Sequence, residues 1–423
     1  MKKLAIAMVL PWLLEAQSIP ELFDALKSHS QVKADTVLVK RSEVQADMVE
    51  SSLYPKINLF ASYDNYSDAT GMVPVPPNQL LDMVKDQSVA QPFSTNIYRA
   101  GAKFSMPIFV KSIYTTADKA AAMQRSAKAK KHINILKNEA VIVGANANFL
   151  YLVSLKKSLH GKEKSLLETK KTLQIKVENG RSPASSLYKI NDSLNEVAIA
   201  KNNIELQERQ IISTIESLTG ISLKEPVLMQ RIGVYQKGSL GSLKPLQEKI
   251  KADRANIKAQ KEKLYPALYA HGSYVFSQAK AYNNDKDITE KYGNIGLVLN
   301  IPLLEMSQYD SIAIANVELQ SSTVELEKLS DELRAEAKML ESSLSLLENS
   351  MKLYKHSVED KKRLLEIAKV NFNSGRLSTE EYLRYEDSVV AQEANLYKTQ
   401  ATKWQTMMQL AVIYANNIEE IVR

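Results

Sequence analysis

Side chains that commonly carry catalysis or bind metals are few in this sequence, and they are scattered. The five histidines have no metal-ligand spacing, and there are no cysteines. No glycine-rich phosphate loop and no strained nucleophile turn occurs. We therefore expect no enzyme: no catalytic residue, no cofactor and no metal.

Basic residues are slightly in excess, with a net charge of +7. Clusters such as Lys128–His132 sit among apolar positions of a helical pattern, which is typical of a solvated helix face. No zinc spacing or RNA-binding signature surrounds them. We therefore expect no nucleic acid among the partners.

Two short turns, each built around a glycine, are the other places where residue types and spacing indicate a role. Both follow a long helical pattern, so Gly180 and Gly375 are expected in the left-handed conformation that closes a helix. Ser378 can cap the next helix, and Glu381 can complete a capping box. A plain helical hairpin explains these residues equally well, whereas exposed Arg181 and Arg376 favour docking of a partner.

The helices that carry these turns are predicted to be very long. No proline lies between Pro107 and Pro183, and no glycine lies between Gly296 and Gly375. A seven-residue apolar repeat marks the second of these stretches, which is typical of supercoiled helices. Its two core positions hold Leu326, Leu333, Leu340, Leu347, Tyr354, Lys361 and Ala368, and Ala337, Leu344, Met351, Val358, Leu365 and Phe372.

Three motifs occur twice in the same order, which predicts an internally duplicated chain. Leu53-Tyr54-Pro55 matches Leu264-Tyr265-Pro266, YRAGAKFSMPIF matches GNIGLVLNIPLL, and ENGRSPASSLYKINDS matches NSGRLSTEEYLRYEDS. The first repeat, 19–219, is predicted to contain a helix, strands 56–66 and 97–107, helix 110–178, turn 179–183 and helix 184–219. A linker in the equatorial region, 220–242, leads to the second repeat, 243–423. That repeat is predicted to contain a helix, strands 267–276 and 293–302, helix 307–374, turn 374–378 and helix 379–417.

The first residues, MKKLAIAMVLPWLLEAQS, are predicted to be a secretory signal peptide, 1–18. Lys2 and Lys3 precede a short apolar core, and Ala16-Gln17-Ser18 resembles a cleavage site. The apolar core is too short to span a membrane. The chain is therefore expected to be exported.

The four strands alternate between apolar and polar residues. Ile57, Leu59 and Tyr63 share one face of the first strand, whereas Asn58 and Ser62 share the other. This alternation fits a soluble half-buried sheet or a membrane β-barrel, and the export signal and strand lengths favour the barrel. Four strands cannot close a barrel, so several chains would have to pool them.

The doubled arrangement resembles the TolC family of outer-membrane efflux proteins over nearly the whole mature chain. The resemblance is carried by the early helix IPELFDALKSHSQVKAD, the Tyr-Pro before a strand, strand ends such as MPIF and IPLL, and the turn FNSGRLS. It implies a mostly α-helical homotrimer with a 12-stranded β-barrel in outer-membrane lipid and a periplasmic α-helical barrel of coiled coils. The implied role is an efflux or type I secretion exit duct, joined to an inner-membrane transporter through a periplasmic adaptor, or membrane fusion protein.

The resemblance also implies roles for residues at the turns. Adaptor hairpins would dock on Asn179, Gly180, Arg181 and Ser182, and on Ser374, Gly375, Arg376, Leu377 and Ser378. Acidic side chains would line the closed end as a ring of charge; the candidate gate and lumen charges are Glu381, Arg384, Asp387, Lys189 and Asp192. The position matching Glu381 in the first repeat is Ser186, and Lys189 and Arg384 would neutralise such a ring. A solvated helix face is the competing interpretation for each of these charges.

Two other classes remain in view. An exported periplasmic or surface coiled-coil structural protein, or adhesin, would explain the heptads and the signal, but not four amphipathic strands at matching points. A membrane fusion adaptor would require lipoyl-like and barrel-like β-domains, which the sequence does not contain.

Overall fold

The computed structural model describes residues 18–423, so the predicted signal peptide lies outside the described residues except for Ser18. The chain divides into two compact units. One comprises the described residues up to Val39 together with Ala127–Pro245 and Glu325–Arg423; the other comprises Lys40–Ser126 and Leu246–Val324. Each unit is described by itself below.

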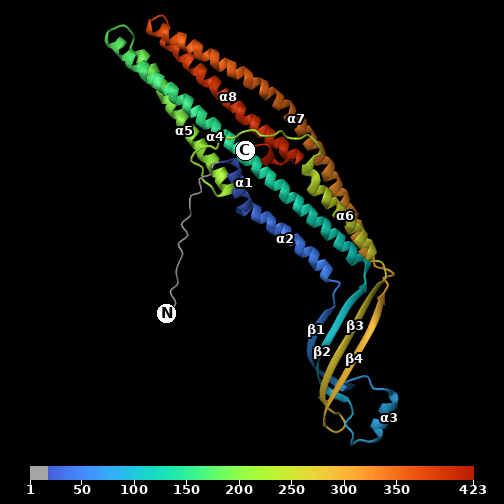
Figure 1. Cartoon of the computed structure of the whole chain (residues 1–423). Coiled ribbons are helices and arrows are strands. Elements are labelled where there is room, and N and C mark those ends of the chain that lie inside the picture. The colour runs from blue at the N-terminus through green and yellow to red at the C-terminus, as the bar shows by residue number, and fades with distance from the viewer. Residues whose placement is uncertain (1–17) are drawn as a thin grey trace, which may run out of the picture. The chain divides into compact units, whose positions relative to one another are not determined.

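The first unit consists of helices. It holds α1 (Ile19–Ser28), α5 (Ser185–Thr219), α8 (Thr379–Tyr414) and the C-terminal parts of α4 (Lys111–Glu178) and α7 (Met306–Asn373). Figure 1 shows α4 beside α5 and α7 beside α8, and one apolar cluster joins all four helices. The absence of proline and glycine from the interior of α7 is the local reason that it runs unbroken for 68 residues.

The predicted heptad positions form the inner face of α7. Ala337, Leu340, Val358, Ala368 and Phe372 are buried, and the other predicted core positions from Leu326 onward are half-buried. Leu152, Leu159, Leu166 and Leu173 of α4 continue the same seven-residue spacing in the cluster that they share with α7. The prediction of coiled-coil packing is therefore confirmed for this helix.

The N-terminal helix is broken, contrary to the single helix that the sequence predicted. α1 ends at Ser28, and the extended backbone of His29 separates it from α2 (Ser30–Ser51). The His29 ring lies against Gly220, which ends α5 in the left-handed conformation, and an added Cβ there would come within 3.3 Å of the ring. This close approach explains why a small residue is needed at the end of α5.

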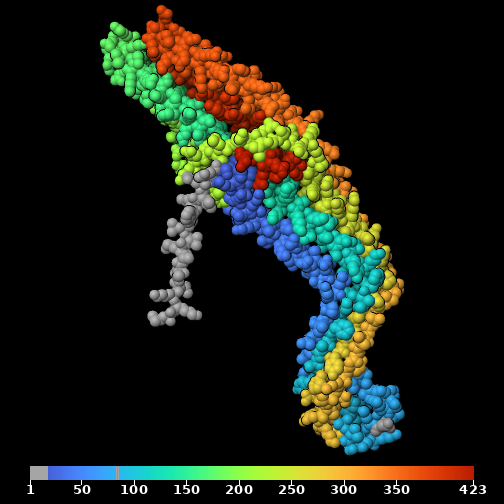
Figure 2. All heavy atoms as spheres, in the orientation of Figure 1, coloured from blue at the N-terminus to red at the C-terminus, as the bar shows by residue number. Residues whose placement is uncertain are grey.

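The linker lies against the C-terminal end of the chain. The Gln230 and Arg423 backbones exchange hydrogen bonds of 2.7 and 3.0 Å, and the Ile232 N–H donates to the Ile421 carbonyl at 3.0 Å. In Figure 2 the yellow-green linker runs alongside this red C-terminal segment. The last helix is shorter than predicted: α8 ends at Tyr414, because Ala415 adopts a left-handed cap, and η2 (Ile418–Glu420) follows it. η1 (Gly241–Leu243) ends the linker.

The second unit contains one antiparallel sheet in the order β1-β2-β3-β4 (Figure 1). Its strands are β1 (Lys56–Gly71), β2 (Phe93–Phe109), β3 (Ala267–Lys280) and β4 (Asp287–Asn300). The loop between β1 and β2 contains α3 (Pro77–Lys85), and α6 (Lys244–Glu262) precedes β3.

Three of the strands extend beyond their predicted ends at 66, 107 and 276, and β4 is displaced from the predicted 293–302. The segment from 277 to 292, between the two strands predicted for the second repeat, is mostly strand, with a turn only at 281–286. At this end the face that is apolar elsewhere becomes polar, and a small apolar cluster of Ile97, Ala279 and Ile288 lies on the other face. The alternation that marks the strands is therefore reversed there. β4 ends at Asn300, before Pro302, which cannot donate a ladder hydrogen bond.

Candidate functional site

The turn between α4 and α5 closes the end of α4 with two backbone hydrogen bonds. Gly180 has a φ of 67°, and its N–H donates to the Val177 carbonyl at 3.0 Å. The Arg181 N–H reaches back to the Lys176 carbonyl at 2.7 Å. Together these two bonds form a Schellman motif, which satisfies carbonyls that the helix end would otherwise leave unpaired.

The turn between α7 and α8 repeats this geometry at the end of α7. Gly375 has a φ of 77°, its N–H donates to the Phe372 carbonyl at 3.1 Å, and the Arg376 N–H donates to the Asn371 carbonyl at 2.9 Å. The predicted capping box is confirmed. The Glu381 N–H donates to Ser378 Oγ at 3.2 Å, and Glu381 Oε2 accepts from the Ser378 N–H at 3.0 Å.

The two turns differ in how the next helix begins. α5 follows Pro183 and Ala184, and its N-cap residue Ala184 makes no side-chain capping bond. α8 begins with the capping box, and the hydrogen bonds from Ser378 lower the pKa of Glu381. Arg181 and Arg376 are exposed at both turns, as the sequence predicted.

Most of the predicted gate charges are engaged in ion pairs or hydrogen bonds within the first unit. Lys189 Nζ lies 2.9 Å from Glu380 Oε2, and the hydrogen bond from Lys189 lowers the Glu380 pKa. Asp387 pairs with the nearly buried Lys162 of α4. The exposed Arg384 also acts on Glu380 and Glu381, lowering the pKa of both. Asp192 is exposed, and no ion pair to it occurs within the described residues.

A buried acidic residue close to these charges was not identified from the sequence. Glu386 accepts hydrogen bonds of 2.5 Å from the Tyr382 hydroxyl and from Ser165 Oγ. Burial and this carboxylate raise the pKa of Tyr382 to about 12, and its ring stacks on Phe372 at 4.9 Å. Glu386 could have been found from its spacing, because it lies four residues from Tyr382 on the inner face of α8.

A second buried carboxylate belongs to α4. Glu139 is 2% exposed, and its Oε2 atom has no hydrogen-bond partner. Burial, and to a lesser extent the nearby Glu419 carboxylate, raise its pKa to about 7, against the opposing effect of Lys27. Lys27 and Glu419 form an ion pair between α1 and η2.

The outer face of α7 carries apolar residues that nothing covers in the single chain. Met339, Leu346, Leu353 and Ile367 are exposed at heptad spacing, interrupted once by Asp360; Leu346 is 66% and Leu353 70% exposed. We call these four residues the α7 stripe. On α5, Ile199 and Leu206 are likewise exposed and seven residues apart.

One face of the sheet is apolar and exposed. The strand register places Leu59 opposite Ala102, Ala102 opposite Tyr274, and Tyr274 opposite Gly293, so the apolar positions of all four strands share this face. Leu59 is 84% exposed and Ile295 is 82% exposed. We call it the apolar face. Among residues 18–423, no helix combines the length and the apolar character needed to cross a membrane.

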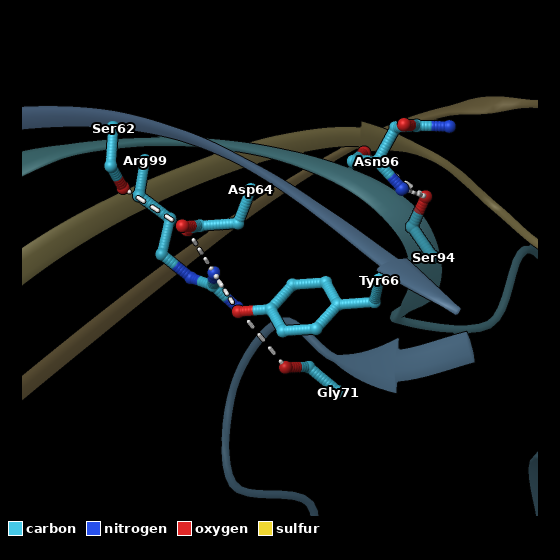
Figure 3. A network of polar contacts seen from close by, with 7 residues as sticks. All are labelled: Ser62, Asp64, Tyr66, Gly71, Ser94, Asn96 and Arg99. Atoms are coloured by element: carbon cyan, nitrogen blue, oxygen red, sulfur yellow. Dashed lines mark hydrogen bonds and ion pairs between the residues drawn. The ribbon is translucent and has the colours of Figure 1, made fainter. Parts of the chain in front are cut away.

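The opposite face of the sheet carries polar residues together with a small apolar cluster around Ile97 and Ala279, and an arginine organises one end of it (Figure 3). Arg99 donates to Asp64 at 2.8 Å and to the Tyr66 hydroxyl at 3.0 Å, and it reaches the Gly71 carbonyl at 3.5 Å. These contacts join both sides of the irregularity in β1 between Asn65 and Thr70. The network holds the strand end in place and does not resemble a catalytic arrangement.

Within the described part of the chain, no group of three or more histidine or acidic side chains is arranged to hold a metal ion. No protein-family model matches the sequence. No curated protein matches it either.

Solved structures, in contrast, match nearly the whole chain. The outer membrane protein VceC from Vibrio cholerae is 15% identical with a TM-score of 0.77, over 94% of this chain and 96% of that one. The CmeC outer membrane channel of Campylobacter jejuni is 15% identical with a TM-score of 0.77, over 94% and 85%. The open state of the MtrE outer membrane channel of Neisseria gonorrhoeae is 13% identical with a TM-score of 0.73, over 95% and 89%. The chain therefore has the fold of these outer membrane channels, the fold that its resemblance to the TolC family predicted.

Proposed function

We propose that this protein is the outer-membrane exit duct of a tripartite efflux or type I secretion system, and that it carries no catalytic activity. Three chains would form a β-barrel in outer-membrane lipid and an α-helical tunnel in the periplasm. Substrates would pass through it from an inner-membrane transporter and a periplasmic adaptor to the outside. The fold shared with outer membrane channels supports this assignment.

The observation that carries the proposal is the exposed apolar face of the sheet. Its residues alternate with polar ones on the other face, as in membrane strands that face lipid on one side and water on the other. An exported coiled-coil structural protein or adhesin gives no reason for such a sheet. Tyr54 and Tyr265 at one end, and Tyr63 and Tyr98 towards the other, are placed as aromatic girdles.

The open edges of the sheet support assembly into a trimer. β1 and β4 each pair on one side only, and an unpaired strand edge in lipid costs several kcal/mol for each unsatisfied group. Pairing β4 of one chain with β1 of the next would remove every edge. Three four-stranded sheets would supply twelve strands, an even number within the range of outer-membrane barrels.

The helical unit supports the same assembly. The α7 stripe and the exposed pair on α5 lie on different helices, as a head-to-tail ring requires, because each chain then presents one surface to each neighbour. Packing the stripe of one chain against α5 of the next would bury both at coiled-coil spacing. Internal duplication of the chain accounts for two helical hairpins that resemble each other.

The two turns are proposed as the adaptor-docking surface. Both expose an arginine beside a left-handed glycine, so a ring of three chains would present six such turns. The charges nearby are proposed to line the closed end of the tunnel. Lys189 and Lys162 already pair with Glu380 and Asp387, which lowers the net charge that such a ring would carry.

A conduction measurement tests this function. The protein, extracted from membranes in mild detergent, is reconstituted into planar bilayers, and the current is recorded with and without applied voltage. We expect discrete ion-conducting events that require the full-length assembly. A chain recovered as a periplasmic monomer that inserts no channel would support the structural-protein alternative and overturn the proposal.

A further inference from the structure

The apolar face of the sheet changes its chemistry towards the end that carries the β1–β2 and β3–β4 connections. Along β1 and β2, the paired residues on this face pass from Leu59 with Ala102 to Tyr63 with Tyr98. The pair beyond them is Asn65 with Asn96. Apolar, aromatic and amide side chains thus follow one another within a few residues, the order found when passing from hydrocarbon through an interface to headgroups.

The neighbouring strands repeat this change. On β3, Phe276 is followed on the same face by Gln278 and then Lys280. Thr289 and Asp287 of β4 lie directly opposite these last two residues. Hydrogen-bonding groups from all four strands therefore gather at one level of the sheet.

A cavity of about 780 Å³ lies at this level, within the size range of ligand sites. We call it the tyrosine notch; it is lined by Tyr63, Tyr98, Asn96, Gln278, Tyr282, Asp285 and Asp287, among others. The Tyr63 and Tyr98 rings are 4.7 Å apart, and the Tyr63 hydroxyl donates to Asn96 Oδ1 at 2.9 Å. Tyr282 is 69% exposed at its rim.

The wall of the notch is fixed by contacts between the two connections. Asn283 Nδ2 donates to the Val89 carbonyl at 2.9 Å, and Asn284 Nδ2 donates to the Ser88 carbonyl at 3.2 Å. The Tyr282 N–H donates to the Phe93 carbonyl at 2.9 Å. The turn that carries Tyr282 and Asp285 is therefore held in place before any ligand arrives, which reduces the entropy cost of binding.

These groups suit a saccharide. Flat tyrosine rings can stack on the C–H face of a sugar, while amides and carboxylates bond to its hydroxyls. The notch holds two carboxylates, Asp285 and Asp287, and one ammonium, Lys280. This balance of charge disfavours a phosphate headgroup and favours a hydroxyl-rich neutral one.

We propose that the tyrosine notch binds the sugar headgroup of a membrane glycolipid whose acyl chains lie on the apolar face. The inference rests on the proposed membrane role of that face. A glycolipid is preferred to a free sugar because the notch continues directly from the apolar face, so one molecule can occupy both. Binding would fix the depth of the sheet in the bilayer.

The test uses the purified assembly in nanodiscs of a zwitterionic phospholipid that contain a minor fraction of a lipid with a neutral disaccharide headgroup. Native mass spectrometry counts the glycolipid molecules retained as the bilayer is stripped away. We expect retention of the glycolipid over the phospholipid. Tyr63→Ala and Tyr282→Ala should each weaken retention about threefold to tenfold, as expected for loss of one aromatic contact.

Tyr274→Ala is the matched control. Tyr274 lies on the same face, and both it and Tyr63 are 55% exposed, but it does not line the notch. Tyr274 would contact the acyl chains of either lipid, so its loss should leave the preference for glycolipid over phospholipid unchanged. Parallel nanodiscs containing an anionic phospholipid, and a competition with the free disaccharide, separate a charge-driven site and a soluble-sugar site from the proposed one.

Equal retention of glycolipid and phospholipid by an inserted assembly would overturn this inference and leave the proposed duct intact. So would preferential retention of the anionic phospholipid, full displacement by free disaccharide, or an equal loss of the preference for glycolipid in Tyr63→Ala and Tyr274→Ala. Failure of the chain to enter nanodiscs at all would overturn the proposed membrane role, and this inference with it.

Discussion

The two helical hairpins of the first unit, α4–α5 and α7–α8, have the same turn geometry but different surroundings. Both long helices end in a Schellman motif at a left-handed glycine. Only α8 then begins with a capping box, whereas α5 begins without a side-chain cap. α4 is covered by α1 and the C-terminal segment, whereas α7 exposes an apolar stripe.

This difference indicates that the shared turn geometry is fixed by a few residues, whereas the surfaces of the two hairpins differ. The glycines set the turns, and the heptad leucines set the packing between helices. The remaining surface is free to vary. It supplies an inner anchoring surface on α4, and on α7 it supplies the surface that we propose as an interface between chains.

Breaking the α7 stripe should have the largest effect. Leu346→Glu with Leu353→Glu would bury unpaired carboxylates between chains, each costing about 3–5 kcal/mol, so the assembly should dissociate. Mass measurement in detergent checks the number of chains. Lys352→Glu, on the same exposed stretch but outside the stripe, is the control and should stay assembled. An assembly that survives the double substitution would show that the stripe is not an interface.

Removing the charge of the buried Glu139 on α4 should have the next largest effect on the stability of the protein. The raised pKa means that folding disfavours the ionised form. The wild type should therefore lose stability as pH rises from about 4.5 to about 7, and then level off. Glu139→Gln should remove this slope and gain on the order of 3 kcal/mol above pH 7. Denaturant unfolding across this pH range measures both. A slope that persists in the variant would contradict the assignment.

Replacing the glycine of either turn should lower stability by the same amount in the two hairpins. Gly180→Val and Gly375→Val each force a branched residue into the left-handed region, at a cost of about 1–2 kcal/mol. A Cβ meets no atom within 4 Å at either site, so the cost comes from the backbone alone. Gly→Asn at the same positions should be milder. If the turns dock an adaptor, the valine variants should lose export in a transport assay while remaining trimeric; unchanged export would count against docking there.

Loss of a helix cap should have the smallest effect on stability, and the effect should differ between the two hairpins. Ser378→Ala should cost about 1 kcal/mol, and Ser182→Ala close to nothing, because α5 lacks a side-chain cap. The lowered pKa of Glu381 makes the capping box stabilising above the ordinary carboxyl range, and this contribution is lost as pH falls through that lowered pKa. The Ser378→Ala penalty measured in strong acid should therefore be smaller than at neutral pH. Equal losses of stability in Ser378→Ala and Ser182→Ala would contradict the predicted difference in capping between α8 and α5.

Much of this fold could be predicted from local chemistry. A long stretch without proline predicted α4, and a long stretch without proline or glycine predicted α7. The spacing of Leu340, Val358 and Phe372 predicted the buried face of α7. Ser378 and Glu381 predicted a capping box because that motif depends only on nearby residues. Such features can be predicted from the sequence because the residues that cause them lie within one or two helical turns of each other.

What could not be predicted depends on contacts between distant segments. Nothing local marks Glu139 as buried, because η2 and α1 cover it from opposite ends of the chain. The break at His29 depends on its packing against Gly220. The extra length of β3 was not predicted because the apolar residues change sides there: Gln278 and Lys280 lie on the face that is apolar elsewhere, whereas Ala279 is buried on the other.

The most direct test of the central claim is the mass and location of the native assembly. The protein is expressed with its N-terminal segment, membranes are separated by density, and the extracted complex is weighed by native mass spectrometry. The account predicts outer-membrane material whose mass is three times that of the mature chain. A monomer in the periplasmic fraction would contradict it.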